Sequence, residues 1–250
     1  MKKLLFMLTV LATLFSLISC VDGAINIQRL EFYRSSDNSY IVSVGDAKYL
    51  DKIVIPKTYF GMPVVEIEEN GFRNCERLER VTIPNSITSI GSMAFADCRK
   101  LKNVEIRDGV TSIGSYAFLG CISLESIVIP DGVTHIKSGV FEECKSLESV
   151  VIPDSVESIG HNAFYQCESL KSIVIPDGVT SIDQTAFYGC KSLESIVIPK
   201  SITSIGTRAF YGNGSFISIK YRGTEEEWNS INKENNWIYR YDIIYNYDGE

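Results

Sequence analysis

The sequence has few of the residue types on which enzymes and metal sites depend. Its 250 residues include only two histidines, His135 and His161, and neither lies among acids or cysteines in a pattern that suggests a catalytic relay. The seven cysteines include no close pair of the C-x-x-C kind that zinc sites use. No phosphate-binding glycine loop is present, and Ser112 lacks the G-x-S-x-G setting of a nucleophile. We therefore expect neither an enzyme nor a protein that binds a metal or cofactor.

The sequence is also short of basic charge. It carries 24 Lys and Arg against 31 Asp and Glu, which gives a formal net charge of −7. An acidic protein repels phosphate backbones, so nucleic acid is not expected as a partner. Hydrophobic residues make up 45% of the chain and charged residues 22%, which is typical of a globular protein and argues against disorder.

The N-terminus lacks an apolar run long enough to span a membrane. Leu4 to Ile18 is an uncharged run of 15 residues, shorter than the ~20 that a spanning helix needs. A run of this length behind Lys2 and Lys3 is typical of a signal peptide, which we place at residues 1–19. The sequence Leu17-Ile18-Ser19-Cys20 resembles the bacterial lipobox.

That resemblance implies cleavage after Ser19 and acylation of Cys20. Two or more acyl chains give stable anchoring, so the resemblance implies an exported protein held to a membrane by its lipid, in the outer membrane or at the cell surface. A plain secretory signal with a chance cysteine is the alternative interpretation.

Most of the remaining chain is an internal repeat of 23 residues. Six unbroken copies run from Leu78 to Ser215, a longer copy precedes them from Leu50 to Arg77, and an incomplete copy starts at Phe216. The period is plainest in two sets of residues. These are Cys75, Cys98, Cys121, Cys144, Cys167 and Cys190, and Phe72, Phe95, Phe118, Phe141, Phe164, Phe187 and Phe210.

Each unit contains two extended segments and one helical turn. Residues 124–129 are rich in β-branched residues whose faces alternate, which predicts a strand that Pro130 ends. Asp131-Gly132 predicts a turn, and a short extended piece follows. One helical turn then carries Val140, Phe141 and Cys144. A single unit cannot bury its apolar face alone, so the units must stack as a solenoid, with parallel strands ~4.8 Å apart.

The repeated unit is similar to that of the BspA-like leucine-rich repeat family of bacterial surface proteins. The resemblance covers residues 50–221 and rests on whole units of the form IP-[DNK]-[GS]-[VI]-x-x-I-x-x-x-AF-x-x-C-x-x-L. It implies a leucine-rich repeat solenoid, a curved right-handed superhelix of 23-residue coils, at the cell surface. It also implies attachment to host proteins or to other cells. The sequence departs from the pattern at Arg107 for proline, Gly139-Val140 for x-Ala, Gly71 for alanine and Asn213 for cysteine.

Residues 20–49 and 222–250 are expected to cap the two ends of the solenoid. The first cap is predicted to be a hairpin. In the second, Thr224 and Glu227 form a capping box for a short helix that buries Trp228 and Ile231. An aromatic-faced strand should follow, from Trp237 to Tyr247, and lie over the last coil. A sugar-binding platform is the alternative interpretation of this aromatic cluster.

The repeat cysteines allow two interpretations. The export route permits disulfides, and six is an even number. Stacked coils, however, point their Cβ vectors in parallel, whereas a disulfide needs facing Cβ atoms ~3.8 Å apart. We therefore predict a ladder of small, buried, reduced cysteines.

Two outward columns on the first strand of each unit form the candidate binding surface, on the concave face. Serine and valine repeat there through four consecutive coils, and an exposed apolar stripe favours a protein or glycan partner on host or neighbouring cells. The candidate residues are Ser126, Val128, Ser149, Val151, Ser172, Val174, Ser195 and Val197. The alternatives are that β-propensity alone sets these columns, or that the protein is a structural envelope component without an external ligand. A further column, Tyr165, Tyr188 and Tyr211, is interpreted as convex-side packing or as a second interface.

Overall fold

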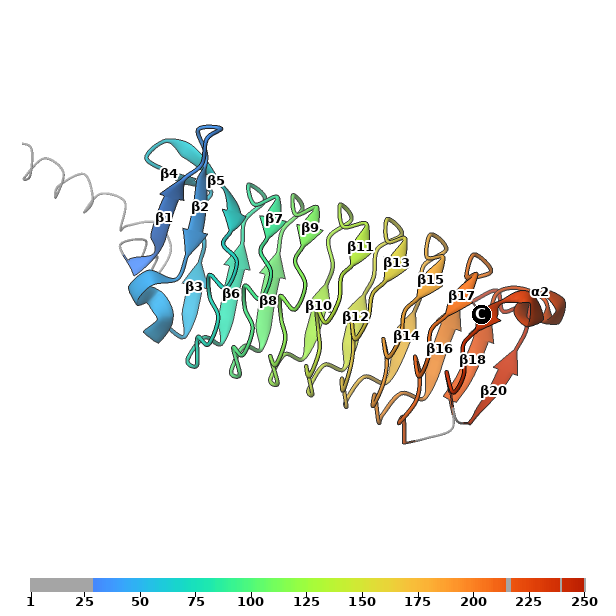
Figure 1. Ribbon diagram of the computed structural model, residues 1–250. Helices are drawn as coiled ribbons and strands as arrows, with labels where there is room; N and C mark the ends of the chain where they lie inside the picture. Colours follow the sequence, from blue (N-terminus) through green and yellow to red (C-terminus); the bar gives the residue numbers. More distant parts are fainter. Residues whose placement is uncertain (1–28, 215–216, 239, 250) are drawn as a thin grey trace, which may run out of the picture.

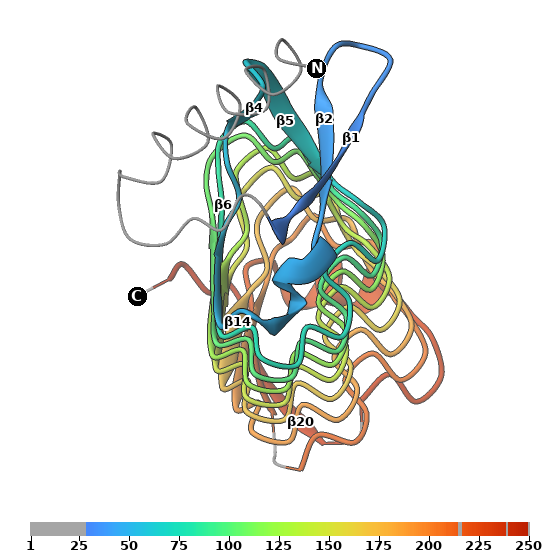
Figure 2. The same cartoon turned by 90° about the vertical axis from the view of Figure 1, so that its left-hand side faces the viewer.

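The computed structural model describes residues 29–214, 217–238 and 240–249, which form a solenoid of stacked coils (Figure 1). The predicted signal peptide, Cys20 and the start of the predicted first cap lie outside these residues. Seen along the solenoid axis, the successive coils nearly superimpose (Figure 2). Within the described part of the chain, no helix is long and apolar enough to cross a membrane.

One side of the solenoid is formed by the first strand of each coil, and we call it the long-strand side. Neighbouring strands that pair run parallel and one repeat apart, as where Ser126 lies opposite Ser149. The last strand pair extends this side past the repeats. The strands are β3 (Lys52–Val54), β6 (Arg80–Ile83), β8 (Asn103–Ile106), β10 (Ser126–Val128), β12 (Ser149–Val151), β14 (Ser172–Val174), β16 (Ser195–Ile198), β18 (Ile217–Tyr221) and β20 (Tyr241–Ile244).

A second, short-strand side is formed by the second extended segment of each coil. Its strands are β2 (Tyr40–Ser43), β5 (Met62–Ile67), β7 (Ser89–Ile90), β9 (Ser112–Ile113), β11 (His135–Ile136), β13 (Ser158–Ile159), β15 (Ser181–Ile182), β17 (Ser204–Ile205) and β19 (Asn232–Lys233). The first repeat is longer because β4 (Thr58–Tyr59) turns back antiparallel onto β5.

The third side of each coil is the predicted helical turn, which the structure forms as a run of tight turns. In one coil, Ala94 and Ala96 donate backbone hydrogen bonds to Gly91 and Met93, three residues back. Met93 (φ 54°) and the residue four positions later, Asp97 (φ 59°), are left-handed, so an α-helix cannot continue through them. These turns also bond from coil to coil. The Phe95 N–H, for instance, donates to the Ala117 carbonyl over 2.8 Å.

The core is a ladder of phenylalanine rings. The seven repeat phenylalanines are all at most 1% exposed, and their rings stack with centroids 5.1 to 5.7 Å apart. This stacking is the reason each coil depends on its neighbours, because each ring is covered by the next.

The six repeat cysteines lie beside this ladder, buried and unpaired with one another. Five of them donate an S–H hydrogen bond to a phenylalanine carbonyl of the preceding coil, such as Cys121 Sγ to Phe95 O at 3.2 Å. Burial raises the pKa of the Cys190 thiol to about 12. The predicted ladder of buried thiols is confirmed. Each donating S–H group gives a phenylalanine carbonyl oxygen a hydrogen-bond donor that an alanine at the same position could not supply.

The long-strand side is interrupted at two junctions, between β8 and β10 and between β12 and β14. At the second, the short-strand side stays paired through β13 and β15. The stack is loosest at the first, between the coil of β8 and β9 and the coil of β10 and β11. Neither β8 and β10 nor β9 and β11 are joined in one sheet. The turn side remains bonded there, with the Phe118 N–H donating to the Val140 carbonyl over 2.9 Å. The Phe118–Phe141 ring spacing at this junction, 5.7 Å, is the widest among the repeat phenylalanines.

We attribute this looseness to Val140. It fills a buried position that is alanine in the neighbouring coils, at Ala117 and Ala163. Protein interiors are close-packed, so two additional methyl groups in a column of alanines displace one coil from the next. The preceding Gly139 fits the same crowding, because a Cβ there would lie 2.2 Å from the Tyr116 ring.

Both ends of the solenoid continue its sheets. β1 (Glu31–Arg34) and β2 form an antiparallel hairpin, and β2 then pairs in parallel with β5, before η3 (Gly45–Tyr49) leads into the first repeat. At the other end, α2 (Glu225–Ser230) has the predicted capping box, and Trp228 and Ile231 are buried as expected.

The final strand differs from its prediction. β20 is shorter than the predicted segment and pairs in parallel with β18, so it extends the long-strand side instead of lying over the last coil. The Trp237 carbonyl accepts the Phe210 N–H over 2.7 Å, in the way that alanine carbonyls do between repeats. This end is therefore a degenerate further coil.

Candidate partner-binding surface

The long-strand side carries a stripe of exposed valines. Val128, Val151 and Val174 are 61%, 56% and 53% exposed, and we call these three the valine stripe. They point outward because the strand alternates, with Ile127 and Ile173 buried behind them. Val128 lies in register with Val151, whereas β14, which carries Val174, is not joined to β12 in one sheet. The three serines beside the stripe, Ser126, Ser149 and Ser172, are also exposed.

The stripe is one coil shorter than predicted. Val197 is only 9% exposed and Ser195 is half-buried, so these two residues do not offer the surface that the sequence suggested. In register with Val197 stands Lys220, and Arg222 crosses the same coil to reach Asp177 Oδ1 at 2.7 Å. We attribute the cover over Val197 to these two long side chains of the chain's last coils.

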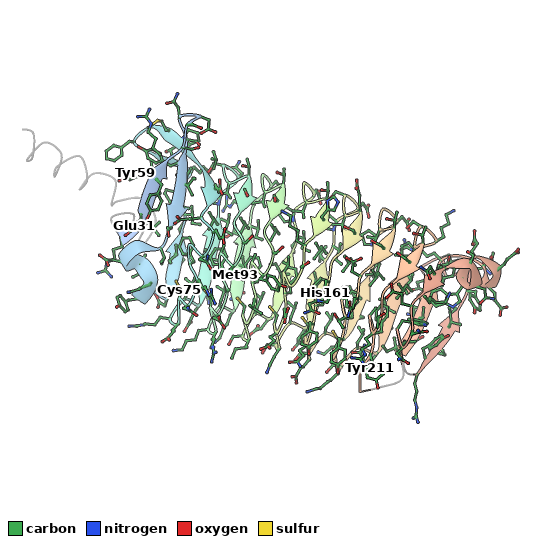
Figure 3. The ribbon with its side chains drawn as sticks, viewed as in Figure 1. Glu31, Tyr59, Cys75, Met93, His161 and Tyr211 are labelled. Carbon is green, nitrogen blue, oxygen red and sulfur yellow. The ribbon has the colours of Figure 1, made fainter. Side chains whose placement is uncertain are left out.

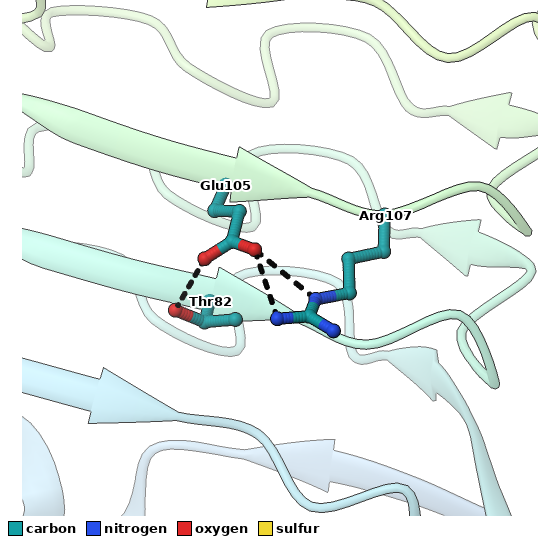
Figure 4. Close-up of polar contacts among 3 residues, drawn as sticks. All are labelled: Thr82, Glu105 and Arg107. Carbon is teal, nitrogen blue, oxygen red and sulfur yellow. Dashed lines mark hydrogen bonds and ion pairs between the residues drawn. The ribbon is translucent and has the colours of Figure 1, made fainter.

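Toward the N-terminus, the same columns are polar and bonded to one another. Thr82 Oγ1 donates to Glu105 Oε2 over 3.3 Å, and Glu105 Oε1 accepts from Arg107 Nε at 3.1 Å (Figure 4). Arg107 stands where other coils have proline, so the substitution supplies the cation of this cluster. The outward side chains of Thr82 on β6 and Glu105 on β8 are thus bonded to each other.

A cleft of about 350 Å³ separates these two parts of the long-strand side. It lies at the loose junction and is lined by Asn103–Ile106 of β8 and Ser126–Val128 of β10. Val104 and Ile106 are partly exposed there, whereas Ile127 and Ile129 in the next coil are buried. Sequence reasoning missed this cleft, although its signals are two of the departures from the repeat, Arg107 and Val140.

The tyrosine column does not form an open platform. The Tyr165 and Tyr188 rings stack with centroids 5.1 Å apart, and the Tyr188 and Tyr211 rings stack at 6.0 Å. Arg208 lies over the Tyr211 ring at 5.9 Å. Because the rings cover one another's faces, the column presents mainly ring edges, as packing would predict.

The C-terminal aromatic residues are likewise occupied with one another. Trp237 meets Trp228 at an interplanar angle of 63° and Tyr241 at 55°. Rings tilted in this way do not make the flat surface on which a sugar stacks. This mutual packing favours the cap interpretation over the sugar platform.

The two histidines lie on separate coils. His135 is exposed on β11, and its Nδ1 lies 2.8 Å from the Thr134 hydroxyl. His161 lies in a turn, with its Nδ1 3.4 Å from the Thr185 hydroxyl (Figure 3). Among the described residues, no group of three or more His, Cys, Asp or Glu is arranged to hold a metal ion.

Comparison with known proteins places the chain in a family. A family model of the BspA type leucine rich repeat region matches residues 45–171 and 157–235, which together are well over half of the chain. The chain belongs to the BspA-type leucine-rich repeat family. This family is associated with protein binding or adhesion in general, and its solenoid is typical of binding scaffolds that lack enzymatic activity.

Two solved structures support the fold of this BspA-type chain. A T. pallidum leucine-rich repeat protein is 26% identical over 80% of this chain and 86% of its own, with a TM-score of 0.56. A leucine-rich repeat protein from Bacteroides ovatus ATCC 8483 is 26% identical over 90% of this chain and 71% of its own, with a TM-score of 0.59. No curated protein matches the chain. The predicted leucine-rich repeat solenoid is thus confirmed.

Proposed function

We propose that this protein is a lipid-anchored adhesion or binding protein of the cell surface, which holds a macromolecule on host or neighbouring cells against its valine stripe. The observation that carries the proposal is the exposure of Val128, Val151 and Val174 in consecutive coils. Ile127 and Ile173 are buried behind Val128 and Val174, and Val150 is half-buried behind Val151, so the exposed valines face away from the interior. Exposed apolar residues in consecutive coils are typical of interaction sites.

The serines beside the stripe help a partner to approach. Ser126, Ser149 and Ser172 are small, so neighbouring side chains do not hold a partner away from the sheet. A standard interface buries roughly 1,200–2,000 Å² in total, more than three valines supply. The partner must therefore also cover the serines and the polar residues around the stripe, which matches the apolar centre and polar rim of known interfaces.

Capture of partners by three versions of the mature chain, residues 20–250, tests the binding surface. The baits are the parent, Val151→Glu/Val174→Glu, and the control Thr180→Glu/Thr203→Glu, which places the same charges on exposed positions of neighbouring coils on the short-strand side. Each bait is offered host matrix proteins and, separately, envelope components of the producing cell. We expect the parent and control baits to retain a host protein or glycan that the valine variant loses, because an unpaired charge buried in an interface costs several kcal/mol.

Two outcomes would contradict the proposal. Equal capture by all three baits would move the site away from the valine stripe. Capture of envelope components alone would favour a structural envelope protein without an external ligand. Thermal melting of each bait must accompany the assay, since directly opposed like charges cost ~0.2–1 kcal/mol and a near-normal melting curve is expected.

The anchoring part of the proposal has its own experiment. Replacing Cys20 with alanine should abolish lipid labelling and release the protein from membranes, because the lipid supplies the membrane affinity. Replacing Ser16, inside the apolar run, with alanine is the control and should leave both unchanged. A Cys20→Ala protein that stays as membrane-bound as the parent would show that the lipoprotein interpretation is wrong.

A further inference from the structure

Carboxylates flank the valine stripe on both sides. Glu125 and Glu148 are exposed one residue before β10 and β12, and Asp131 and Asp154 are exposed in the turns that follow these strands. Glu148 pairs with Lys171 Nζ at 2.7 Å. The other three take part in none of the ion pairs found among the described residues. At the matching position before β14 stands Lys171, so one side of the rim carries two carboxylates and one cation, and the other carries Asp131 and Asp154. The summed charge is negative on both sides of the stripe.

The coil spacing of the solenoid is closer to one helical turn than to the two-residue repeat of an extended chain. In the coils that carry the stripe, the stacked rings of Phe141, Phe164 and Phe187 are 5.4 and 5.1 Å apart. An α-helix rises 5.4 Å per turn, so a helix lying along the solenoid axis would present one side chain per turn to each coil. In an extended chain, residues on one face are about 6.6–6.8 Å apart, and it would fall out of step by more than about 1 Å at each coil.

We propose that the partner segment seated on the valine stripe is an amphipathic α-helix with basic flanks. Its apolar residues, at positions i, i+3 or i+4, and i+7, lie over Val128, Val151 and Val174. Lysines or arginines on either side of its apolar face lie toward Glu125 on one side and Asp131 and Asp154 on the other. This inference rests on the proposed binding function, for which it names the chemistry of the partner.

Four synthetic peptides of equal length serve as probes for this inference. The first is a helix with leucines at the heptad spacing and lysines on both flanks. The second replaces its lysines with glutamates, the third scrambles the first so that the leucines lie all round the helix, and the fourth alternates valine and lysine as a strand. Affinity for the protein is measured by titration at low and at high salt, with the parent, Val151→Glu/Val174→Glu and Asp131→Asn/Asp154→Asn.

We expect the lysine-flanked helix to bind the parent about tenfold or more tightly than any other peptide, a difference of ~1.4 kcal/mol. Added salt should weaken this binding, because the charges at the rim are exposed and screened. The valine variant should lose it. The Asp131→Asn/Asp154→Asn variant should keep the preference for the heptad helix over its scramble and lose most of the preference for lysine over glutamate.

Three results would overturn the inference: equal binding of the lysine and glutamate helices, equal or tighter binding of the alternating strand, or no measurable binding of the lysine-flanked helix at about 1 mM, which is ~4 kcal/mol of affinity. Binding of the lysine helix that survives the valine substitutions would also overturn it, because it would be non-specific attraction to an acidic protein. The proposed function fails separately. The valine variant could lose its captured partner while the protein binds all four peptides equally. In that case the valine stripe remains the proposed binding surface, and only the inference of a helical partner is wrong.

Discussion

The long-strand side is built differently on the two sides of the cleft between β8 and β10. Before the cleft, Thr82 bonds to Glu105 of the next coil, and Glu105 pairs with Arg107 of its own coil. After it, the matching columns are serine and exposed valine, as at Ser149 and Val151. The first part uses its outward residues to join neighbouring coils, and the second leaves them for another molecule to cover. This comparison is our reason for placing the partner after the cleft.

The difference also shows how a repeat protein can change its surface without changing its fold. The phenylalanine ladder runs through both parts, and only the fit between coils changes at the junction. In a solenoid each coil contacts its neighbours alone, so a buried substitution at Val140 acts on the junctions of its own coil.

The largest expected effect comes from breaking the ladder itself. Phe164→Ala should cost about 3–5 kcal/mol of unfolding free energy, because it removes a buried ring stacked between two others. Phe118→Ala should cost less, since its spacing to Phe141 is already the widest of the ladder. Denaturant titration of both variants measures the comparison. A Phe118→Ala cost equal to or above that of Phe164→Ala would contradict a looser junction.

A smaller loss of stability is expected when the valine of the loose junction is introduced at a tightly packed junction. Ala163→Val places the larger side chain of Val140 at the same position of the next coil, where the cross-coil bonds of the turns and of the short-strand side are intact. Overpacking of this kind costs ~1–3 kcal/mol, and it should also open the local ladder. Thermal melting gives the cost, with Thr180→Ala on the surface as the control. No loss of stability would show that the alanine column does not set the coil spacing.

The reverse substitution should tighten the loose junction. In intact coils the Thr180 and Asp183 N–H groups donate to Glu157 and Ile159 of the coil before. The matching N–H groups of Thr134 and Lys137 make no such backbone bond. Val140→Ala should let these two bonds form, so that the two amides exchange with solvent as slowly as those of Thr180 and Asp183.

Amide hydrogen exchange with residue resolution measures this prediction, with the Thr180 amide as an internal reference. Val140→Ala loses the burial of two methyl groups. The two new backbone hydrogen bonds contribute about 1 kcal/mol each and offset part of that loss, so the net change in the free energy of unfolding should be small. Unchanged exchange at Thr134 and Lys137 in Val140→Ala would mean that another residue opens the junction.

The smallest effect is expected at Glu142, in the coil that follows the junction. Burial raises the pKa of this carboxyl, Glu143 adds to the rise, and a hydrogen bond from Asn162 opposes it. Because the pKa of Glu142 is higher in the folded than in the unfolded protein, folding favours the protonated carboxyl. Its contribution to the free energy of unfolding is present below the unfolded-state pKa and is lost as pH rises through the folded-state pKa. Glu142→Gln should therefore raise Tm at pH 7 by no more than ~2 °C, and the gain should vanish at acid pH. A gain in Tm that grows toward acid pH would contradict a raised pKa of Glu142.

The sequence predicted much of this molecule, because its main features repeat. The 23-residue period predicted the stacked coils, and the cysteine column predicted buried thiols. The capping box at Thr224 was also predicted, because both of its hydrogen bonds join residues that are only three positions apart in the sequence. Outward and inward residues were also separated correctly for Val128, Val151 and Val174.

What the sequence did not reveal depends on contacts between residues far apart in the chain. Val197 follows the pattern of the stripe, but its cover comes from Lys220 and from Arg222, which reaches Asp177 45 residues away. The cleft depends on how a valine fits against alanines of adjacent coils, and in a repeat pattern that exchange looks conservative. How well the side chains of adjacent coils pack together cannot be predicted from the 23-residue period.

Carboxyl footprinting of the complex with the captured partner tests the central claim most directly. The reagent labels exposed Asp and Glu, and labelling is compared between the free and the bound protein. We predict that labelling falls at Glu125 and Asp154 beside the valine stripe and stays unchanged at Glu157 and Asp183, which are exposed toward the short-strand side. Protection of Glu157 and Asp183 with none at Glu125 and Asp154 would show that the partner binds elsewhere and that the valine stripe is not its site.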